Sequence, residues 1–274
     1  MSIEATTEIL SQTKETGEWE PPMPPTDLIF DDGEPLETNR HRTAMNVLIE
    51  SLQHAWRDRN DFYTGGNMFI YYSSNQIRNR DFRGPDFFVV IGVDGSKIRQ
   101  GWVVWEEDGR YPDVIIELMS SSTAQIDTGA KKDLYERIFR TPDYFVFNPF
   151  NPNSLQGWHL DANQRYQPLV ANEKGWLWCE TLGLWLGTWE GIIQRELAVW
   201  LRFYYPDGNL VLLPYEAAQQ QAEAERLRAE AAQQQAEAER LRAEAAQQQA
   251  EAERLRAERL AARLRALGED PDAL

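Results

Sequence analysis

Two acidic residues, Asp86 and Glu117, border or interrupt apolar segments of the kind that forms buried strands. The segments read FFVV over residues 87–90 and VIIEL over residues 114–118. A carboxylate in such a place is costly unless a positive group meets it. Two carboxylates on neighbouring strands would form a hard oxygen site suited to a divalent cation. The pattern therefore indicates metal-assisted hydrolysis.

Three further polar residues follow at helical spacing. Asp127, Lys131 and Tyr135 are each four residues apart, so they share one face of a helix. A helix between two strands packs on their sheet, which would direct Lys131 at Glu117. There it would orient a nucleophile or stabilise developing negative charge. Taken alone, an Asp–Lys pair at this spacing more often only stabilises a surface helix.

Periodicity and turn residues predict the elements that position these side chains. A helix is predicted from Glu37 to Trp56, with Thr38 as its cap. Residues 121–123 are the expected caps of the helix that contains Lys131. Strands are predicted around residues 62–72, 86–93, 101–106, 114–119, 144–147, 157–160 and 182–186. The strand–helix–strand order makes two of these strands parallel, and together the elements predict a mixed α/β sandwich.

The end of the chain is a repeat without globular character. Residues 216–257 are three identical units, EAAQQQAEAERLRA, made mostly of strong helix formers, so a long helix is predicted. In the best heptad register Ala fills one core position while Leu and Gln alternate at the other, which makes a weak seam. A coiled-coil homo-oligomer and a single solvated helix both remain open. The predicted organisation is an irregular arm (1–36), an α/β domain (37–215), a helical tail (216–267) and a flexible C-terminus (268–274).

Composition narrows the class of protein. The 274-residue chain has a formal net charge of −16, which argues against indiscriminate nucleic-acid binding unless a basic groove or a metal focuses positive charge. Its single cysteine, Cys179, excludes an internal disulfide framework and is expected to be a buried, inert thiol. We find no signal peptide and no apolar run long enough to span a membrane. A cytoplasmic protein without a membrane partner is expected.

Several spaced motifs carry a family resemblance. They are GPD (84–86), ELMS (117–120) with ST (122–123), DxGxKxxxY (127–135), TPDYFVFNP (141–149), ExxxH (37–41) and GWLW (175–178). With these motifs, the part of the chain from about residue 25 to 215 resembles the Uma-two type restriction endonuclease family of the PD-(D/E)xK nuclease superfamily. The resemblance implies a restriction-endonuclease-like mixed sheet flanked by helices, a nuclease site that uses Mg²⁺ or Mn²⁺, and DNA as partner.

The family's site residues can be carried over one by one. Asp86 and Glu117 take the roles of catalytic residues and metal ligands. The superfamily's usual lysine would fall at Met119, which cannot do that work, so the resemblance assigns the cation to Lys131 on the following helix. Lys132 points about 100° away and is the weaker candidate. Supporting roles fall to Glu37, His41, Asp127 and Tyr135.

The chain departs from the family pattern at three places. Ala124-Gln125 stand where the family often has an arginine, Asn148 replaces the usual Asp before Pro149, and residues 191–202 look like an insertion. His41 is also compatible with an ordinary polar residue of a helix. The tryptophans at positions 176, 178, 185 and 189 are expected in the core rather than on a base-stacking platform.

The function expected from residues and resemblance is that of a Mg²⁺-dependent DNA endonuclease. The alternative is a catalytically inactive nuclease-like module that binds or scaffolds and assembles through its coiled coil. Hydrolysis of another phosphate substrate is a third hypothesis, because a fold does not fix a function.

Overall fold

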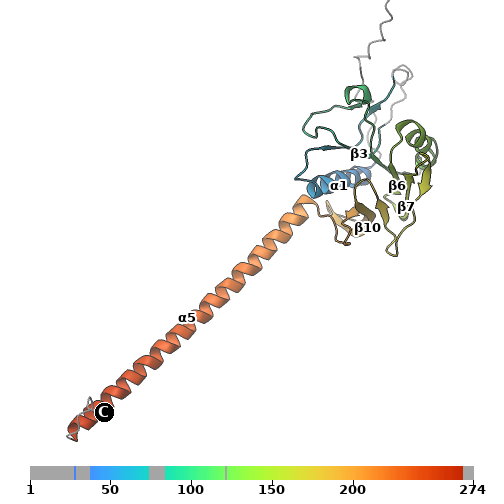
Figure 1. The fold of residues 1–274 in the computed structure, drawn as a ribbon. Coiled ribbons are helices and arrows are strands. Elements are labelled where there is room, and N and C mark those ends of the chain that lie inside the picture. Colours follow the sequence, from blue (N-terminus) through green and yellow to red (C-terminus); the bar gives the residue numbers. More distant parts are fainter. Residues whose placement is uncertain (1–27, 29–37, 74–83, 121, 268–274) are drawn as a thin grey trace, which may run out of the picture. The chain divides into compact units, whose positions relative to one another are not determined.

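The computed structural model describes residue 28 and residues 38–73, 84–120 and 122–267 (Figure 1). Nearly all of the expected N-terminal arm and the segment 268–274 lie outside the described residues, as do Glu37 and Ser121. The chain divides into two compact parts. We call residues 57–209, with the preceding helix up to Ile49, the body. Residues Glu50–Trp56 and the chain from Leu210 onward form the other part.

A six-stranded mixed sheet forms the centre of the body. Its strands lie in the order β1 (Phe62–Gly65), β3 (Phe87–Ile91), β5 (Val114–Leu118), β6 (Asp143–Asn148), β7 (Asn151–Leu160) and β8 (Tyr166–Pro168). Strands β5 and β6 are parallel, and the other neighbouring pairs are antiparallel. The chain crosses from β5 to β6 through a helical segment, as the strand–helix–strand order predicts. The predicted α/β class with a mixed sheet is confirmed.

Strands β3, β5 and β6 are apolar because the body covers both of their faces. On one face Ile115 and Val146 pack in a buried cluster with Tyr135 of the crossover segment. On the other face Phe87 contacts Phe203, with ring centroids 6.1 Å apart. Strands covered on both sides are continuous apolar segments rather than alternating ones, which is why their sequence made them easy to find.

Two smaller sheets complete the body. An antiparallel sheet contains β9 (Leu177–Cys179), β10 (Leu184–Ile193) and β11 (Glu196–Tyr204). The apparent insertion at 191–202 is the end of the β10–β11 hairpin, and its turn contacts the first helix, where Thr43 Oγ1 donates a hydrogen bond to Gln194. Strand β2 (Ile70–Tyr71) pairs in parallel with β4 (Trp102–Val103). The strand expected over 101–106 is therefore shorter, since Val104–Glu106 form a 3₁₀ turn.

The first helix, α1 (Asn39–Ala55), begins two residues later than predicted. Thr38 is its cap, because Thr38 Oγ1 accepts the backbone N–H of His41 at 3.3 Å, as expected. Ala44, Val47 and Leu48 are buried on one side of the helix. On another side Arg40 forms a salt bridge with Glu196.

The crossover segment between β5 and β6 alternates α and π turns. It consists of α3 (Ala124–Ile126), η2 (Asp127–Lys131), α4 (Lys132–Leu134) and η3 (Tyr135–Phe139), in which η2 and η3 are π-helical. The expected cap at Thr123 makes no side-chain bond into the helix. Instead Ser120 Oγ accepts the N–H groups of Ser122 and Thr123, each at 3.2 Å, while Thr123 Oγ1 accepts the N–H of Ser120.

The predicted tail helix is confirmed as α5 (Pro214–Ala266), a single helix of 53 residues (Figure 1). Its first turn is closed by Glu216, whose side chain accepts the N–H of Leu213 at 2.8 Å. None of the residues of α5 is buried. Whether the helix oligomerises stays a prediction. Within the described residues, no helix has the length and apolarity needed to cross a membrane.

Candidate active site

Strand pairing brings Asp86 and Glu117 together, although 31 positions separate them in sequence. Strands β3 and β5 pair with Phe87 opposite Ile116, so the next step of the same antiparallel register places Asp86 opposite Glu117. The backbone N–H of Leu118 donates a hydrogen bond of 2.7 Å to Asp86 Oδ2. Because side chains alternate along a strand, both carboxylates lie on the face of the sheet that the crossover segment covers.

Glu117 is fully buried and is held by the crossover segment. The Tyr135 hydroxyl donates a hydrogen bond of 2.8 Å to Glu117 Oε1. Glu117 Oε2 lies 3.0 Å from Lys131 Nζ but accepts no hydrogen bond of good geometry within the described residues. One oxygen of this buried carboxylate is thus oriented by a hydroxyl, and the other is balanced by charge alone.

Lys131 links Glu117 to a second buried carboxylate. Its Nζ lies 2.9 Å from Oδ1 of Asp127, four residues earlier, and the lysine side chain is 19% exposed. The backbone carbonyl of Asp127 in turn accepts a hydrogen bond of 2.7 Å from the Tyr144 hydroxyl on β6. Asp127 and Lys131 are the ends of the π turn η2, and such turns occur frequently at functional sites.

Burial and neighbouring charge raise the pKa of both Asp86 and Lys131, but for different reasons. Burial, and then the neighbouring Glu117, raise the pKa of Asp86 well above its ordinary value, against the opposing effects of the Leu118 N–H and Lys131. Burial lowers the pKa of Lys131, but the carboxylates of Glu117 and Asp127 outweigh it and raise the pKa above its ordinary value. Lys131 therefore stays protonated at neutral pH.

The two tyrosines beside the site remain neutral donors. Burial first, and then the charge of Glu117, raise the pKa of both Tyr135 and Tyr144 well above the ordinary value. Their hydroxyl groups therefore keep their protons at neutral pH. Each can donate a hydrogen bond while it adds no charge to the cluster.

The donor set suits a magnesium-type ion rather than a transition metal. The carboxylates of Asp86, Glu117 and Asp127 act on one ammonium, that of Lys131, so the site holds excess negative charge when they are ionised. No group of three or more His, Cys, Asp or Glu side chains in the described ranges forms a ready-made metal cage. Mg²⁺ commonly binds through one or two carboxylates, several waters and substrate phosphates. Asp86 and Glu117 fit that requirement.

The other residues expected near the site have different environments. His41 is buried, with Nε2 at 3.4 Å from the carbonyl oxygen of Met119 and Nδ1 at 2.9 Å from Thr38 Oγ1. Met119 itself belongs to the apolar cluster. Lys132 points elsewhere, with Nζ 5.0 Å from the ring centroid of Trp158. Glu37 lies outside the described residues.

Sequence reasoning missed Tyr144, the residue that ties β6 to the π turn. A signal existed, because parallel pairing of β6 with β5 and alternation along the strand put Tyr144 and Val146 on the face of Ile115 and Glu117. The positions of residues in the sequence could not predict which group accepts the hydrogen bond of the Tyr144 hydroxyl. That group is the backbone carbonyl of Asp127.

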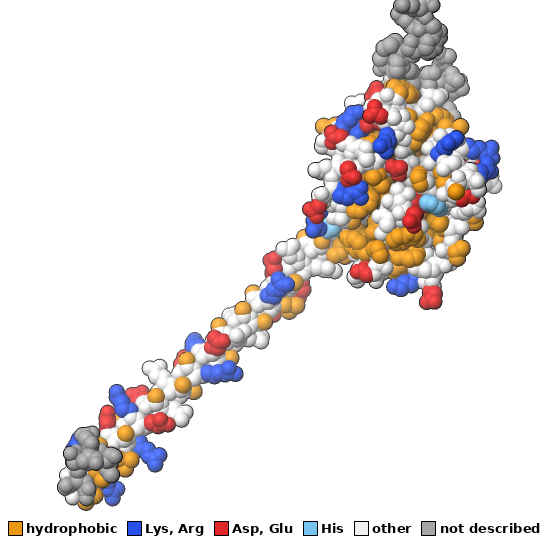
Figure 2. Space-filling view, in the orientation of Figure 1, with side chains coloured by type: hydrophobic (Ala, Val, Ile, Leu, Met, Phe, Trp, Pro, Cys, Tyr) orange, Lys and Arg blue, Asp and Glu red, His pale blue; other side chains and the backbone are white. Residues whose placement is uncertain are grey.

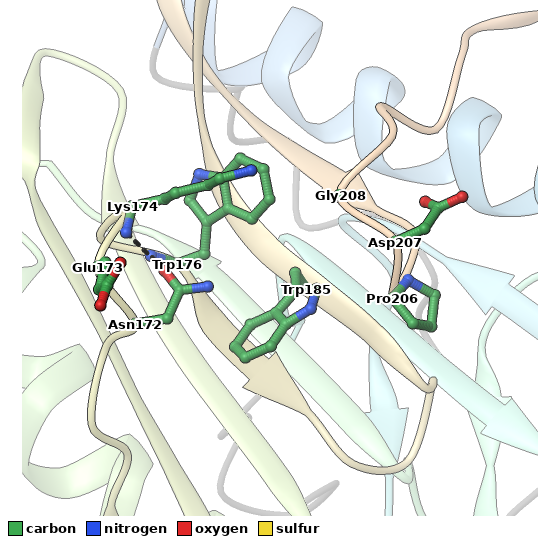
Figure 3. A pocket seen from close by; sticks show the side chains of 8 residues that line it. All are labelled: Asn172, Glu173, Lys174, Trp176, Trp185, Pro206, Asp207 and Gly208. Atoms are coloured by element: carbon green, nitrogen blue, oxygen red, sulfur yellow. Dashed lines mark hydrogen bonds between the residues drawn. The ribbon is translucent and has the colours of Figure 1, made fainter.

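The tryptophan cluster is not core, contrary to expectation. The side chains at positions 176, 178, 185 and 189 are only partly buried. Trp176 stacks on Tyr204 with ring centroids 3.8 Å apart, and Lys174 Nζ lies 4.5 Å from the same ring. Trp176 and Lys174 line an open hollow of about 300 Å³ that Glu173 and Asp207 also border (Figure 3). Because these ring contacts are already made and two carboxylates flank the hollow, it suits nucleic acid poorly.

Comparison with known proteins agrees with the motifs. Residues 17–199, more than half of the chain, match the model of the Uma2 family, described as putative restriction endonuclease. No curated protein matches the chain. Among solved structures, the crystal structure of a putative nuclease belonging to DUF820 from Anabaena variabilis ATCC 29413 is similar over 58% of this chain and 86% of its own, with 12% identity and a TM-score of 0.39. The chain belongs to the Uma2 putative restriction endonuclease family.

Proposed function

We propose that this protein is a metal-dependent DNA endonuclease that hydrolyses phosphodiester bonds in a site formed by Asp86, Glu117 and Lys131. One observation carries the proposal: a partly buried lysine lies 3.0 Å from a fully buried glutamate whose strand neighbour is a second carboxylate. Burying such a charge cluster is costly for a purely structural role. Membership of a family described as restriction endonucleases favours nuclease chemistry and DNA as the substrate.

Each residue has a role that follows from its contacts. Asp86 and Glu117 would hold Mg²⁺ or Mn²⁺, which when bound acidifies a water molecule and neutralises charge on the phosphate. Lys131, protonated at neutral pH, cannot act as a base there and instead orients the nucleophile or stabilises developing negative charge. Asp127 fixes the position of the lysine ammonium. Tyr135 fixes the orientation of the Glu117 carboxylate.

The metal would also help an acidic protein to approach DNA. The chain carries 44 acidic and 28 basic residues. On the face of the body visible in Figure 2, positive and negative side chains are intermixed. Phosphate binding needs local positive charge. A divalent ion at Asp86 and Glu117 would supply it at the place where the bond is cut.

Cleavage of supercoiled plasmid DNA by the purified full-length chain tests this function. We expect nicked and linear products with Mg²⁺ or Mn²⁺, none in EDTA, and none with Glu117→Ala in any condition. Circular dichroism of Glu117→Ala checks that this variant is folded. A wild-type protein that is inert with both metals, on plasmid and on single-stranded DNA, would support the alternative of an inactive binding or scaffolding module.

Removing the Tyr135 hydroxyl should slow cleavage and destabilise the fold together. In Tyr135→Phe, Glu117 Oε1 loses its donor, and hydrogen bonds to charged groups contribute about 1.5–3 kcal/mol. We expect a free energy of unfolding lower by about 2 kcal/mol and a cleavage rate lower by about tenfold.

Tyr166→Phe is the matched control for this change. Its buried hydroxyl donates a hydrogen bond of 2.9 Å to the carbonyl of Thr141 and makes no contact with Glu117 among the described hydrogen bonds. Urea titrations should therefore show a loss of stability in both variants, whereas cleavage should fall only in Tyr135→Phe. If the two variants cleave DNA at the same rate, the Tyr135 hydroxyl has no specific role in cleavage.

A further inference from the structure

Helix α5 exposes a regular apolar stripe along its length. None of its residues is buried, and Leu227, Leu241 and Leu255 are 54%, 54% and 43% exposed. The stripe repeats every seven residues. One seam position holds Ala224, Ala231, Ala238, Ala245 and Ala252, and the other holds Leu227, Gln234, Leu241, Gln248 and Leu255. A heptad stripe of this kind is typical of the seam of a coiled coil.

Charged residues flank this seam in a fixed order. The position before each seam alanine is always glutamate, as at residues 223, 230, 237, 244 and 251. The position after each seam leucine is arginine, at residues 228, 242 and 256, and the position after each seam glutamine is again glutamine. Figure 2 shows side chains of both charges alternating along the helix. These two flanking positions are the ones that set partner choice and orientation in coiled coils.

Ion pairs within the helix use other arginines. Arg226, Arg240 and Arg254 lie 3.6, 3.5 and 3.6 Å from the glutamates four residues later. Within the helix, the flanking glutamates Glu223, Glu230 and Glu244 are thus already paired with Arg226 and Arg240, with 2.8 Å between Glu223 and Arg226. The flanking arginines, together with Glu237 and Glu251, form no such pair among the described residues.

A parallel pair of such helices would give each flanking arginine a glutamate on the other helix. In a parallel, in-register coiled coil each flanking glutamate faces the residue five positions later on the other helix. Three complementary pairs then form on each side of the seam: Glu223 with Arg228, Glu237 with Arg242, and Glu251 with Arg256. An antiparallel pair would instead place glutamate near glutamate and arginine near arginine, which is unfavourable.

We propose that α5 binds a second copy of itself as a parallel, in-register, two-stranded coiled coil. The charges beside the seam select this orientation, because alanine and glutamine in the seam contribute little apolar burial. Since the body precedes α5 in each chain, parallel pairing attaches both bodies to the same end of the coiled coil. This inference goes beyond the proposed nuclease function and does not depend on it.

Charge reversal tests the pairing directly. The wild-type chain, 31.7 kDa, should have the mass of two chains in analytical ultracentrifugation, and high salt should shift it toward one. The triple variant Glu223→Arg, Glu237→Arg, Glu251→Arg should be monomeric, as should Arg228→Glu, Arg242→Glu, Arg256→Glu. An equimolar mixture of these two variants should restore the mass of two chains. The matched control, Glu225→Arg, Glu239→Arg, Glu253→Arg, makes the same charge change away from the seam and should remain a dimer.

Cysteine cross-linking tests the orientation. The native Cys179 is buried, so a thiol introduced in the seam is the one available to an oxidant. Ala224→Cys and Ala252→Cys, at opposite ends of the repeats, should each form a disulfide-linked dimer when oxidised alone. Cross-links that form only when the two variants are mixed would show antiparallel pairing and overturn the proposal. So would a wild-type chain that is monomeric at every concentration, or one with the mass of three or more chains.

Discussion

Replacing Lys131 with methionine is expected to lower the rate of metal-dependent DNA cleavage by about 10²- to 10³-fold. Methionine keeps much of the aliphatic length but removes the ammonium that lies 3.0 Å from Glu117 and 2.9 Å from Asp127. The loss should appear in single-turnover cleavage, in which product release does not limit the rate. Wild-type cleavage by Lys131→Met would exclude the lysine from the chemistry.

The neighbouring lysine supplies the control for this experiment. Lys132 lies above the Trp158 ring rather than beside the carboxylates, so Lys132→Met should cleave as the wild type does. Lys131→Met leaves two buried carboxylates without their cation, which is destabilising. The double variant Lys131→Met, Asp127→Asn removes one of these charges and should recover stability in thermal melts without recovering cleavage. Recovery of both would mean that Lys131 acts through the fold alone.

Replacing Asp86 with asparagine is expected to stabilise the metal-free protein while abolishing cleavage. Burial and Glu117 raise the pKa of Asp86 above its value in the unfolded chain, so the ionised carboxylate is less favourable in the folded protein. Asparagine cannot ionise, and its amide oxygen can still accept the Leu118 N–H. In EDTA near neutral pH we expect a free energy of unfolding higher by about 1 kcal/mol, the usual size of a stabilising substitution at a functional site.

The difference in stability between Asp86→Asn and the wild type should depend on pH. A raised folded-state pKa means that protonated Asp86 contributes stability below the unfolded value of 3.8, and that this contribution is lost as the pH rises through the folded value. The advantage of Asp86→Asn should therefore disappear in urea titrations below pH 3.8. Mg²⁺ should raise the melting temperature of the wild type but not of the variant. A variant that is less stable than the wild type in EDTA would contradict this account.

The central strands and the relevant helix face could be predicted because each has a local signal. Buried strands are continuous apolar segments, and the four-residue spacing of Asp127, Lys131 and Tyr135 survives in the structure, where Lys131 and Tyr135 both reach Glu117. The direct pairing of Asp86 with Glu117 had no such signal. It depends on the strand register, which is set by tertiary packing rather than by the residues near either carboxylate.

Other features lacked a local signal altogether. The π turns have no composition of their own, so residues 127–139 read as an ordinary helix. Thr123 stands at the cap position of the crossover helix but makes no side-chain bond into it, because its hydroxyl accepts the N–H of Ser120 instead. The size of the tryptophans at positions 176, 178, 185 and 189 predicted that they lie in the core, whereas the fully buried tryptophans of the described residues are Trp102 and Trp200. The hydrogen-bond partner of a side chain and the extent of its burial both depend on the whole fold, so the spacing of residues in the sequence predicts neither.

The identity of the three repeats in α5 makes its length an adjustable property. One unit of 14 residues corresponds to two heptads, so gain or loss of a whole unit leaves the phase of the seam unchanged. At 1.5 Å per residue, each unit changes the length of the helix by about 21 Å. Identical tandem segments in a gene readily expand and contract by recombination. We expect closely related chains to have C-terminal helices that differ in length by whole units. The order of charges beside the seam should be the same in all of them, so that each helix still selects the same kind of partner.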